Sequence, residues 1–281
     1  MIKEISILRS KEHQMITVDD VVAIEEPFEI QLETGIASER IRQPLSVTMR
    51  TPGNDEELAV GFLFTEGLIH SKKNLETPVS MPIGDNKLLI RLSTDFDANL
   101  DKIKRNFYTT SSCGVCGKES IEAISQVCNI VASNTPILIN LEQISSLPAK
   151  LMEVQKTFAS TGGIHAAALF DSKGNLLNYR EDVGRHNALD KLIGSALLTD
   201  HSNEFNLVEN ILLLSGRASF ELIQKAAMAG IKIVCAIGAP SSLAVETAQV
   251  FDITLIGFLK SNSCNVYTGA NRIIIPEAHE N

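Results

Sequence analysis

The sequence predicts an α/β protein in which the second half of the chain forms a mostly parallel or mixed sheet covered by helices. Short apolar segments at 211–214, 231–237 and 254–258 alternate there with helical segments, as they do in sheets that helices cover on both faces. The first half instead combines strands of period-two alternation with one helix. This pattern indicates a smaller α+β unit before the α/β unit.

The first half begins with segments that alternate polar and apolar residues, which is the pattern of half-buried strands. Acidic residues then open a helical segment, and Gly67 is suited to end it because glycine readily adopts the left-handed backbone. We expect strands at 18–24, 28–32 and 45–50, a helix at 56–68, and strands at 87–92 and 107–110.

A domain boundary is expected in the crossing segment 134–147, which gives an N-terminal domain 1–140 and a C-terminal domain 141–281. In α/β sheets, ligands bind beyond the carboxyl ends of the strands, so the loops at these ends are the candidate site. The elements predicted after the boundary are a helix at 149–158, a hairpin of strands at 164–170 and 176–180, helices at 187–198, 220–229 and 243–251, and the three strands named above.

The composition excludes several classes of protein. The chain of 281 residues carries a formal net charge of −9, which argues against non-specific nucleic-acid binding because such binding requires a basic surface. No apolar run is long enough to span a membrane, and the start of the chain lacks the apolar core of a signal peptide. The expected location is the cytoplasm, where structural disulfides are rare, and five cysteines is an odd number for a paired framework.

The stretch 111–117, Ser-Ser-Cys-Gly-Val-Cys-Gly, is the part of the sequence that most clearly indicates chemistry. Cys113 and Cys116 are spaced so that their sulfur atoms can share one turn, and the adjacent glycines leave the thiols unshielded. The pair suits a redox dithiol, half of a metal site, or a thiol that carries sulfur, and the helix predicted after it favours a thiolate. The alternative is an inert surface turn. Cys128 and Cys235 lie among apolar residues and are expected to fill the core.

Two loops after the predicted second-half strands carry residues suited to an anionic ligand. In the loop that begins at Ser215, Gly216 permits close backbone approach, and Arg217 can hold a phosphate or a planar polar group through two donors. In the next loop, Ser241 and Ser242 open a helix whose free backbone N–H groups attract anions. Alternatively, the two serines only cap the helix.

A polar cluster that includes Arg185 and His186 lies between a predicted strand and a predicted helix. These residues can bind a polar ligand, and His186 can transfer protons near neutral pH. The alternative is an ion pair between Asp182 and Arg185 beside a capping Asn187. His165 lies inside an apolar strand, where a single histidine is usually a hydrogen-bonded core residue.

Cys113, Cys116 and His165 together raise the hypothesis of a zinc site. Zinc-dependent deaminases combine His-x-Glu with a Pro-Cys-x-x-Cys motif, and the Glu transfers the protons. Here Ala167 stands where the Glu is required, no proline precedes Cys113, and the cysteines come before the histidine. We therefore expect no zinc and no deaminase chemistry.

The chain resembles the FdhD-type formate dehydrogenase accessory sulfurtransferases over residues 21–272. The combination of motifs is specific, although no single motif is. One departure is the run 259–264, where the family usually has basic and glycine residues. The matching segments are 50–53, 57–63, 111–117, 161–169, 181–187, 215–217, 239–244, 257–258 and 265–267.

This resemblance implies a cytidine-deaminase-like, three-layer C-terminal domain without deaminase chemistry. It also implies sulfur transfer: sulfur from a cysteine desulfurase would be held as a persulfide on Cys113, assisted by Cys116. The sulfur would pass to the bis(guanine dinucleotide) form of the molybdenum (or tungsten) cofactor, required by the formate dehydrogenase apoenzyme. The cofactor is then a bound substrate, and GDP or GTP can mimic its nucleotide arms. The expected assembly is a homodimer.

The cofactor-binding residues are expected at the carboxyl edge of the second-half sheet. Two alternatives stay open: a cofactor-binding chaperone that transfers no sulfur, and a zinc-dependent, deaminase-like hydrolase. A thioredoxin-like dithiol is disfavoured because the two cysteines lack the setting of a βαβ unit. The expected cofactor-binding residues are Arg185, His186, Ser215, Gly216, Arg217, Ser241, Ser242, Phe258, Leu259, Lys260, Ser261, Asn262 and Ser263.

Overall fold

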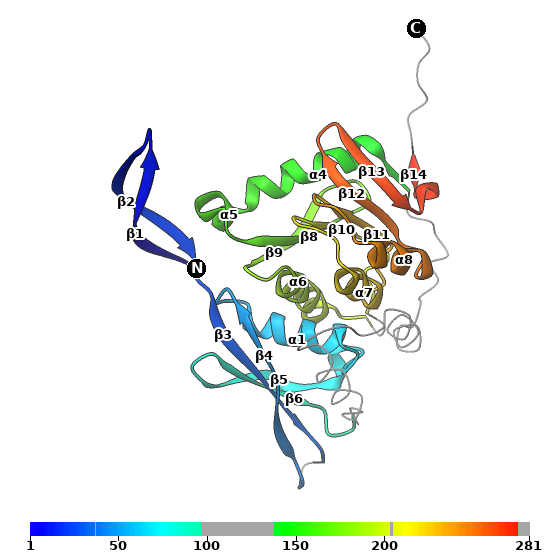
Figure 1. Ribbon diagram of the computed structural model, residues 1–281. Coiled ribbons are helices and arrows are strands. Elements are labelled where there is room, and N and C mark those ends of the chain that lie inside the picture. The colour runs from blue at the N-terminus through cyan, green and yellow to red at the C-terminus, as the bar shows by residue number, and fades with distance from the viewer. Residues whose placement is uncertain (37, 97–137, 203–204, 275–281) are drawn as a thin grey trace.

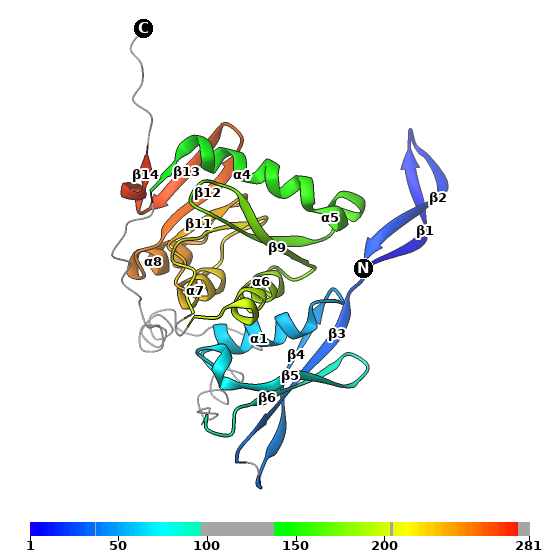
Figure 2. The ribbon, with the colours of Figure 1, turned by 180° about the vertical axis from the view of Figure 1, so that it is seen from behind.

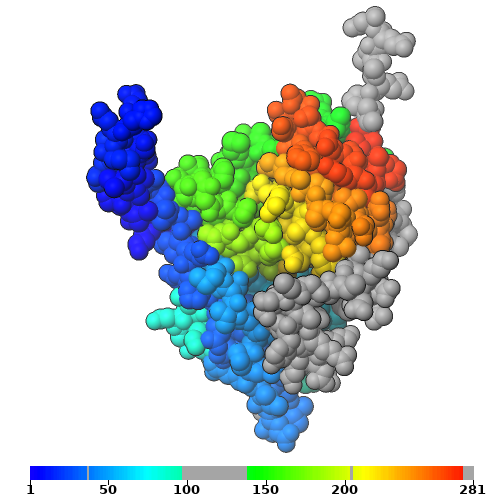
Figure 3. All heavy atoms as spheres, in the orientation of Figure 1, coloured from blue at the N-terminus to red at the C-terminus, as the bar shows by residue number. Residues whose placement is uncertain are grey.

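The computed structural model describes residues 1–36, 38–96, 138–202 and 205–274. Figure 1 shows a larger sheet with helices on both of its faces and a smaller sheet packed below it through helix α1, Asp55–Thr65. A hairpin at the N-terminus projects from this body, as the space-filling view of Figure 3 also shows, and contacts it where β2 (Gln14–Ala23) meets α5 (Lys156–Thr161). The fold is therefore a mixed α/β fold with more than one mixed sheet.

The N-terminal part consists of a hairpin, a four-stranded sheet and one helix. The sheet has the strand order β4-β3-β6-β5, in which β3 and β6 are parallel and the other neighbours are antiparallel. The hairpin pairs β1 with β2 in an antiparallel register and adds no fully buried residue to the core. The bounds are β1 Ile2–Lys11, β2 Gln14–Ala23, β3 Glu26–Thr34, β4 Ile41–Arg50, α1 Asp55–Thr65, β5 Leu75–Gly84 and β6 Lys87–Leu92.

The C-terminal part is built on a six-stranded sheet with the order β13-β12-β11-β10-β8-β9. Strands β10, β11 and β12 are parallel to one another, whereas β8, β9 and β13 run antiparallel to their neighbours, so the sheet is mixed. The strand bounds are β8 His165–Phe170, β9 Leu176–Asp182, β10 Ile211–Leu214, β11 Ile233–Ala236, β12 Thr254–Lys260 and β13 Ser263–Thr268. The helix bounds are α4 Leu141–Val154, α5 Lys156–Thr161, α6 Arg185–Thr199, α7 Phe220–Met228 and α8 Ser242–Val250. A small parallel pair, β7 Ile139–Asn140 with β14 Ile273–Ile274, joins two distant segments.

The two faces of this sheet are buried in separate apolar clusters because successive strand residues point to opposite faces. Leu212 and Leu214 belong to a large cluster with α6, α7 and α8, whereas Leu213 and Cys235 belong to a smaller cluster under α4. Figures 1 and 2 show α4 on one face of the sheet and α6, α7 and α8 on the opposite face. This arrangement confirms the prediction that helices cover both faces of the second-half sheet.

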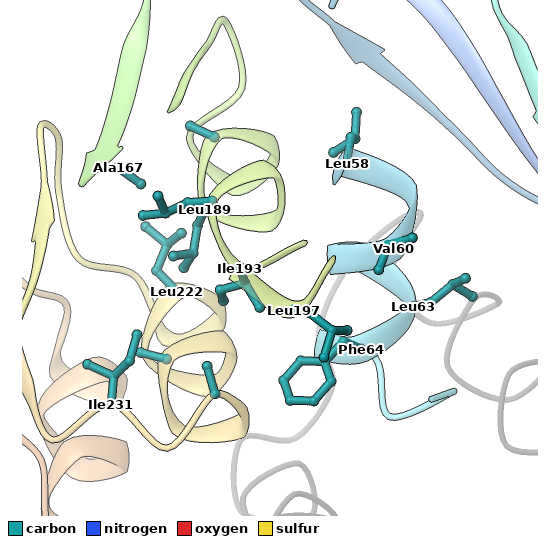
Figure 4. Packing of buried hydrophobic residues seen from close by; sticks show 14 of the residues in the cluster. Leu58, Val60, Leu63, Phe64, Ala167, Leu189, Ile193, Leu197, Leu222 and Ile231 are labelled. Atoms are coloured by element: carbon teal, nitrogen blue, oxygen red, sulfur yellow. The ribbon is translucent and has the colours of Figure 1, made fainter. Parts of the chain in front are cut away.

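Helix α1 joins the two halves by packing closely against α6. A Cβ atom at Gly61 would lie 1.8 Å from the backbone oxygen of Asp190, and one at Gly194 would lie 1.9 Å from that of Glu57. Only glycine permits this distance, so the two helices can approach backbone to backbone. Figure 4 shows apolar side chains of α1, α6 and α7 gathered around this junction, where the large cluster spans both halves of the chain. The division into domains 1–140 and 141–281 stays a prediction, and the apolar core crosses it.

The helix predicted at 149–158 is wrong in its bounds. The structure has two helices there, α4 and α5, which meet at Gln155. Pro148 lies inside α4, not before its start, and Asn140 precedes the first turn, its backbone N–H donating to the Gln143 side chain. The apolar face of α4 is buried against the sheet, and this packing outweighs the usual cost of an interior proline.

Most other predicted elements are present, and several strands were missed. The strand at 87–92 coincides with β6, and the predicted helix 56–68 corresponds to α1, which ends sooner with Gly67 in the left-handed conformation at φ 72°. Strands β1, β5 and β13 were not predicted, and β5 contains Pro78 and Pro82, which argue against a strand in the sequence. The strand predicted at 107–110 lies outside the described residues. None of the helices in the described ranges is long and apolar enough to cross a membrane.

Candidate functional site at the carboxyl edge of the larger sheet

The carboxyl ends of β10, β11 and β12 form one continuous edge, and backbone hydrogen bonds join the loops that follow them. The Gly238 N–H donates to the Gly216 carbonyl at 2.9 Å, and the Phe258 N–H donates to the Gly238 carbonyl at 3.1 Å. The Ala218 N–H donates to the Ala239 carbonyl at 3.2 Å. The three loops that the sequence placed at this edge are therefore neighbours, because parallel strands deliver their following loops to the same side.

The loop after β11 leads into α8 and leaves two hydroxyl groups in solvent. Ser241 and Ser242 are both exposed, and the Ser241 hydroxyl accepts a hydrogen bond from the Ala244 N–H at 3.2 Å. The capping interpretation is thus confirmed for Ser241. Capping satisfies one N–H of the first helical turn, so other donors of this turn stay available to an anion.

The segment predicted as a loop at 258–263 is the tip of the β12–β13 hairpin. Phe258 is 44% exposed with a φ of 51°, a conformation that is rare for a bulky side chain. The register between β12 and β13 shifts here, so Leu259 turns inward and is only 1% exposed, in the cluster under α4. Its side chain is therefore part of the core. Lys260, Ser261, Asn262 and Ser263 are exposed at the tip.

The polar segment before α6 is organised by Asp182, and its partner is not the one considered from the sequence. Asp182 forms an ion pair with Lys191 at 2.7 Å, and the Lys191 ammonium also donates to the Thr51 carbonyl at 2.8 Å. Asp182 further accepts hydrogen bonds from the Gly184 N–H at 2.8 Å and from the Asn187 amide at 3.2 Å. An ion pair between Asp182 and Arg185 is thus wrong for the described structure, because a buried lysine nearly two helical turns after Arg185 takes this position.

His186 points toward the start of α7. Its Nε2 lies 2.9 Å from the Glu221 carboxylate and 3.4 Å from the Ser219 hydroxyl. The hydrogen bond between His186 and Glu221 lowers the pKa of Glu221, and partial burial opposes this shift. Electrostatic interactions with His186 and Arg185 lower the pKa of Glu221 further. The first turns of α6 and α7 are therefore linked beside the loop that carries Arg217.

His165 is a member of this edge that the sequence indicated only as a core histidine or as a ligand of a disfavoured zinc site. It begins β8, which pairs with β10, and a Cβ atom at Gly216 would lie 3.3 Å from its Nδ1 atom. Burial lowers the pKa of His165, the charges of Arg185 and His186 lower it further, and Asp182 opposes them. The missed signal was the pairing of His165 with the strand before Gly216, which no local pattern reveals.

Two arginines at this edge differ from all the others that the structure describes. Arg185 and Arg217 make no hydrogen bond or ion pair with any described residue, and the Nε atom of Arg185 is buried without a partner. Every other described arginine has a hydrogen-bond acceptor or an ion-pair partner in the protein: Arg9, Arg40, Arg42, Arg50, Arg91, Arg180 and Arg272. In a chain of net charge −9, two unpaired guanidinium groups at one edge are available to an anionic ligand.

The cysteine pattern 111–117, with Cys113 and Cys116, lies outside the described residues, as does Cys128. Cys235 is fully buried, as expected, and burial raises its pKa. Cys264, for which no role was assigned, packs against the same cluster as Cys235.

No three His, Cys, Asp or Glu side chains gather to hold a metal ion within the described ranges. The absence of zinc stays a prediction because Cys113 and Cys116 are not described. Elemental analysis of the purified protein is expected to find much less than one zinc ion per chain, since a closed zinc site needs four ligands. One zinc per chain, lost when Cys113 or His165 is replaced, would contradict this expectation.

Comparison with known proteins identifies relatives along nearly the whole chain. Residues 23–274 match the model of the FdhD/NarQ family. The chain is 42% identical over 280 residues to the sulfur carrier protein FdhD of Streptomyces coelicolor, covering 97% of this chain and 95% of that protein. It is 44% identical over 270 residues to that of Mycobacterium tuberculosis, covering 92% and 94%, and 40% identical over 272 residues to that of Sulfolobus acidocaldarius, covering 97% and 98%.

A solved structure has the same fold. The crystal structure of a candidate formate dehydrogenase accessory protein from Desulfotalea psychrophila superimposes with a TM-score of 0.71 at 24% identity, covering 98% of this chain and 99% of that one. At this identity the likeness shows the fold alone. The family model, which matches residues 23–274, and the relatives, which match more than nine tenths of the chain, show that this protein belongs to the FdhD/NarQ family.

Proposed function

We propose that this protein is a sulfurtransferase that serves the maturation of formate dehydrogenase. It accepts sulfur as a persulfide on Cys113 from a cysteine desulfurase and delivers it to the bis(guanine dinucleotide) molybdenum cofactor. The observation that carries this proposal is the near full-length relationship to sulfur carrier proteins of both Streptomyces and Sulfolobus. The carboxyl edge of the larger sheet, with its unpaired Arg217 and exposed Ser241, supports the nucleotide part of the proposal.

The transfer chemistry uses the two thiols of the Cys-x-x-Cys pair, together with an external thiol that returns them to the reduced state. The Cys113 thiolate attacks the terminal sulfur of the donor persulfide, so the sulfur–sulfur bond of the donor breaks and the donor cysteine leaves as a thiolate. The Cys116 thiolate can then attack the inner sulfur of the Cys113 persulfide and release the outer sulfur as sulfide. The two electrons that the sulfide gains come from the formation of a Cys113–Cys116 disulfide, which a cellular thiol must reduce before the next cycle.

Mass spectrometry after incubation with a cysteine desulfurase and cysteine tests this proposal directly. The protein is expected to gain the mass of one or more sulfur atoms on Cys113, and the gain should disappear on treatment with a thiol reductant. The Cys116→Ala variant is expected to keep the persulfide but to release its sulfur more slowly, because the neighbouring thiol is lost. A protein that activates formate dehydrogenase without ever acquiring sulfur would instead be a chaperone for the cofactor.

The guanine nucleotide arms of the cofactor are expected to bind at the edge formed by Gly216, Gly238 and Phe258. Arg217→Ala should weaken GDP binding by about tenfold or more, because a charged hydrogen bond contributes on the order of 2 kcal/mol. Calorimetry with GDP and ADP measures this effect and the base preference together. Arg9→Ala is the matched control, since Arg9 lies on the distant β1–β2 hairpin. Equal GDP affinity in wild type and Arg217→Ala would remove Arg217 from the site.

The homodimer expected from the family resemblance also stays a proposal. A second copy can place two such edges in one assembly, which would suit a cofactor that carries two guanine nucleotide arms. Sedimentation of the full-length chain measures the assembly state. A monomer at all concentrations would require a single chain to hold both arms.

A further inference from the structure

One set of residues at the carboxyl edge lies beside the nucleotide loops and takes no part in the proposed sulfur transfer, although Arg185 is among the residues expected to bind the cofactor. It consists of Arg185 at the start of α6, His165 at the start of β8, and the backbone of Gly216. The Nε atom of Arg185 is buried and has no acceptor among the described residues. Because a buried donor without a partner costs about 1–3 kcal/mol, such a group indicates an acceptor that comes from outside the chain.

The ring of His165 is held against Gly216 at close to contact distance. A Cβ atom at position 216 would lie 3.3 Å from Nδ1 and 3.4 Å from Cε1 of this ring. The strands fix this placement, because Ala166 and Ser215 exchange two hydrogen bonds across the β8–β10 pair, at 2.8 and 2.9 Å. The His165 ring itself forms no hydrogen bond with a described residue, so its nitrogen atoms are free to contact a ligand.

The nearby carboxylates already have hydrogen-bond or ion-pair partners, so none of them pairs with Arg185 or His165. Both oxygens of Asp182 accept hydrogen bonds, and one of them also forms the ion pair with Lys191. Glu221 binds His186, and Glu181 accepts hydrogen bonds from two backbone N–H groups at the start of α5. Arg185 therefore forms no ion pair with a described carboxylate, and its hydrogen-bond donors are left for a ligand.

We propose that Arg185 and His165, set against the Gly216 backbone, form a binding site for a small oxyanion group. Phosphate and molybdate share the required chemistry: a compact, tetrahedral anionic group whose oxygen atoms accept hydrogen bonds from a guanidinium and an imidazole. The assignment of this oxyanion to the cargo rests on the proposed function. Its two sources would be a phosphate of a nucleotide arm and the metal–oxo end of the cofactor.

Isothermal titration calorimetry of the full-length protein with molybdate and with inorganic phosphate tests the site. Wild type is expected to bind at least one of these anions, and Arg185→Gln should bind it about tenfold or more weakly, because a charged hydrogen bond is lost. Arg9→Gln removes the same charge from the exposed hairpin and should leave the affinity unchanged. Failure of wild type to bind either anion, or equal affinity in wild type and Arg185→Gln, would overturn the site.

A pair of glycine variants tests the geometry without a change of charge. Gly216→Ala should displace the His165 ring and weaken anion binding, whereas a Cβ atom at Gly163 would meet only one backbone oxygen, at 3.8 Å, so Gly163→Ala should bind as wild type does. Circular dichroism melting verifies that each variant is folded. If Arg185→Gln does not fold, the comparison of Gly216→Ala with Gly163→Ala decides whether the anion site exists. Equal affinity in the two glycine variants would contradict the placement of His165 in the site.

Repeating the titration with saturating GDP distinguishes the two sources of the oxyanion. Anion binding that persists beside GDP assigns the site to the metal–oxo end, and competition assigns it to a nucleotide phosphate; either result supports the site. The outcome is separable from the proposed function. A protein that forms the Cys113 persulfide and binds GDP, but binds neither anion, retains the function and loses only this site.

Discussion

Replacing Cys113 by alanine is expected to abolish the activation of formate dehydrogenase. The reason is chemical: without this thiolate there is no atom to form the sulfur–sulfur bond that carries the transferred sulfur. The measurement is formate dehydrogenase activity in cells that lack their own copy of this protein and express either wild type or the variant. Cys116→Ala is expected to retain part of the activity, because an external thiol can release sulfur from the Cys113 persulfide.

Two controls make the Cys113 result interpretable. Cys264→Ala replaces a half-buried thiol elsewhere in the chain and is expected to keep full activity, and equal amounts of each variant must be verified in the cells. GDP binding by purified Cys113→Ala should equal that of wild type, which would separate sulfur transfer from cofactor binding. Full activation of formate dehydrogenase by Cys113→Ala would overturn its role as the persulfide carrier.

Lys191→Met is expected to lower the free energy of unfolding by about 3–5 kcal/mol, the cost of leaving a buried carboxylate without its counter-charge. Lys191 is 1% exposed and its partner Asp182 is 0% exposed. Both residues also form hydrogen bonds with the backbone of Thr51, which directly follows β4. The pair therefore joins the end of this strand to α6. Urea unfolding followed by circular dichroism gives the difference directly.

The matched control for this prediction is an ion pair on the surface. Arg9 and Asp20 are 54% and 41% exposed at a distance of 3.4 Å, so Arg9→Met is expected to change the stability by less than about 1 kcal/mol. A double variant, Asp182→Asn with Lys191→Met, should be less destabilised than the sum of its two single variants, because both charges are removed together. A loss of less than about 1 kcal/mol in Lys191→Met would contradict the buried ion pair.

The sequence alone was sufficient for the layered second half of the chain. Apolar segments such as 211–214 and 231–237 are short, continuous and separated by amphipathic helices, and the energy of burying such segments on both faces leaves few other arrangements. For the same reason the convergence of the loops at Gly216, Gly238 and Phe258 was predictable, since it follows from parallel strands. The unusual conformation of Phe258 was not, because a φ of 51° in a bulky residue depends on the register shift in the β12–β13 hairpin.

Other features were decided only by tertiary contacts. The partner of Asp182 is Lys191 and not the nearer Arg185, because α6 buries Lys191 beneath Thr51 while Arg185 remains at the edge of the sheet. His165 became part of the site through strand pairing with the segment before Gly216, about 50 residues away in the chain. Hydrophobic periodicity is a local property that specifies which face of an element is buried. Pairing between distant charged and polar side chains depends on which elements pack together, and no pattern along the chain contains that information.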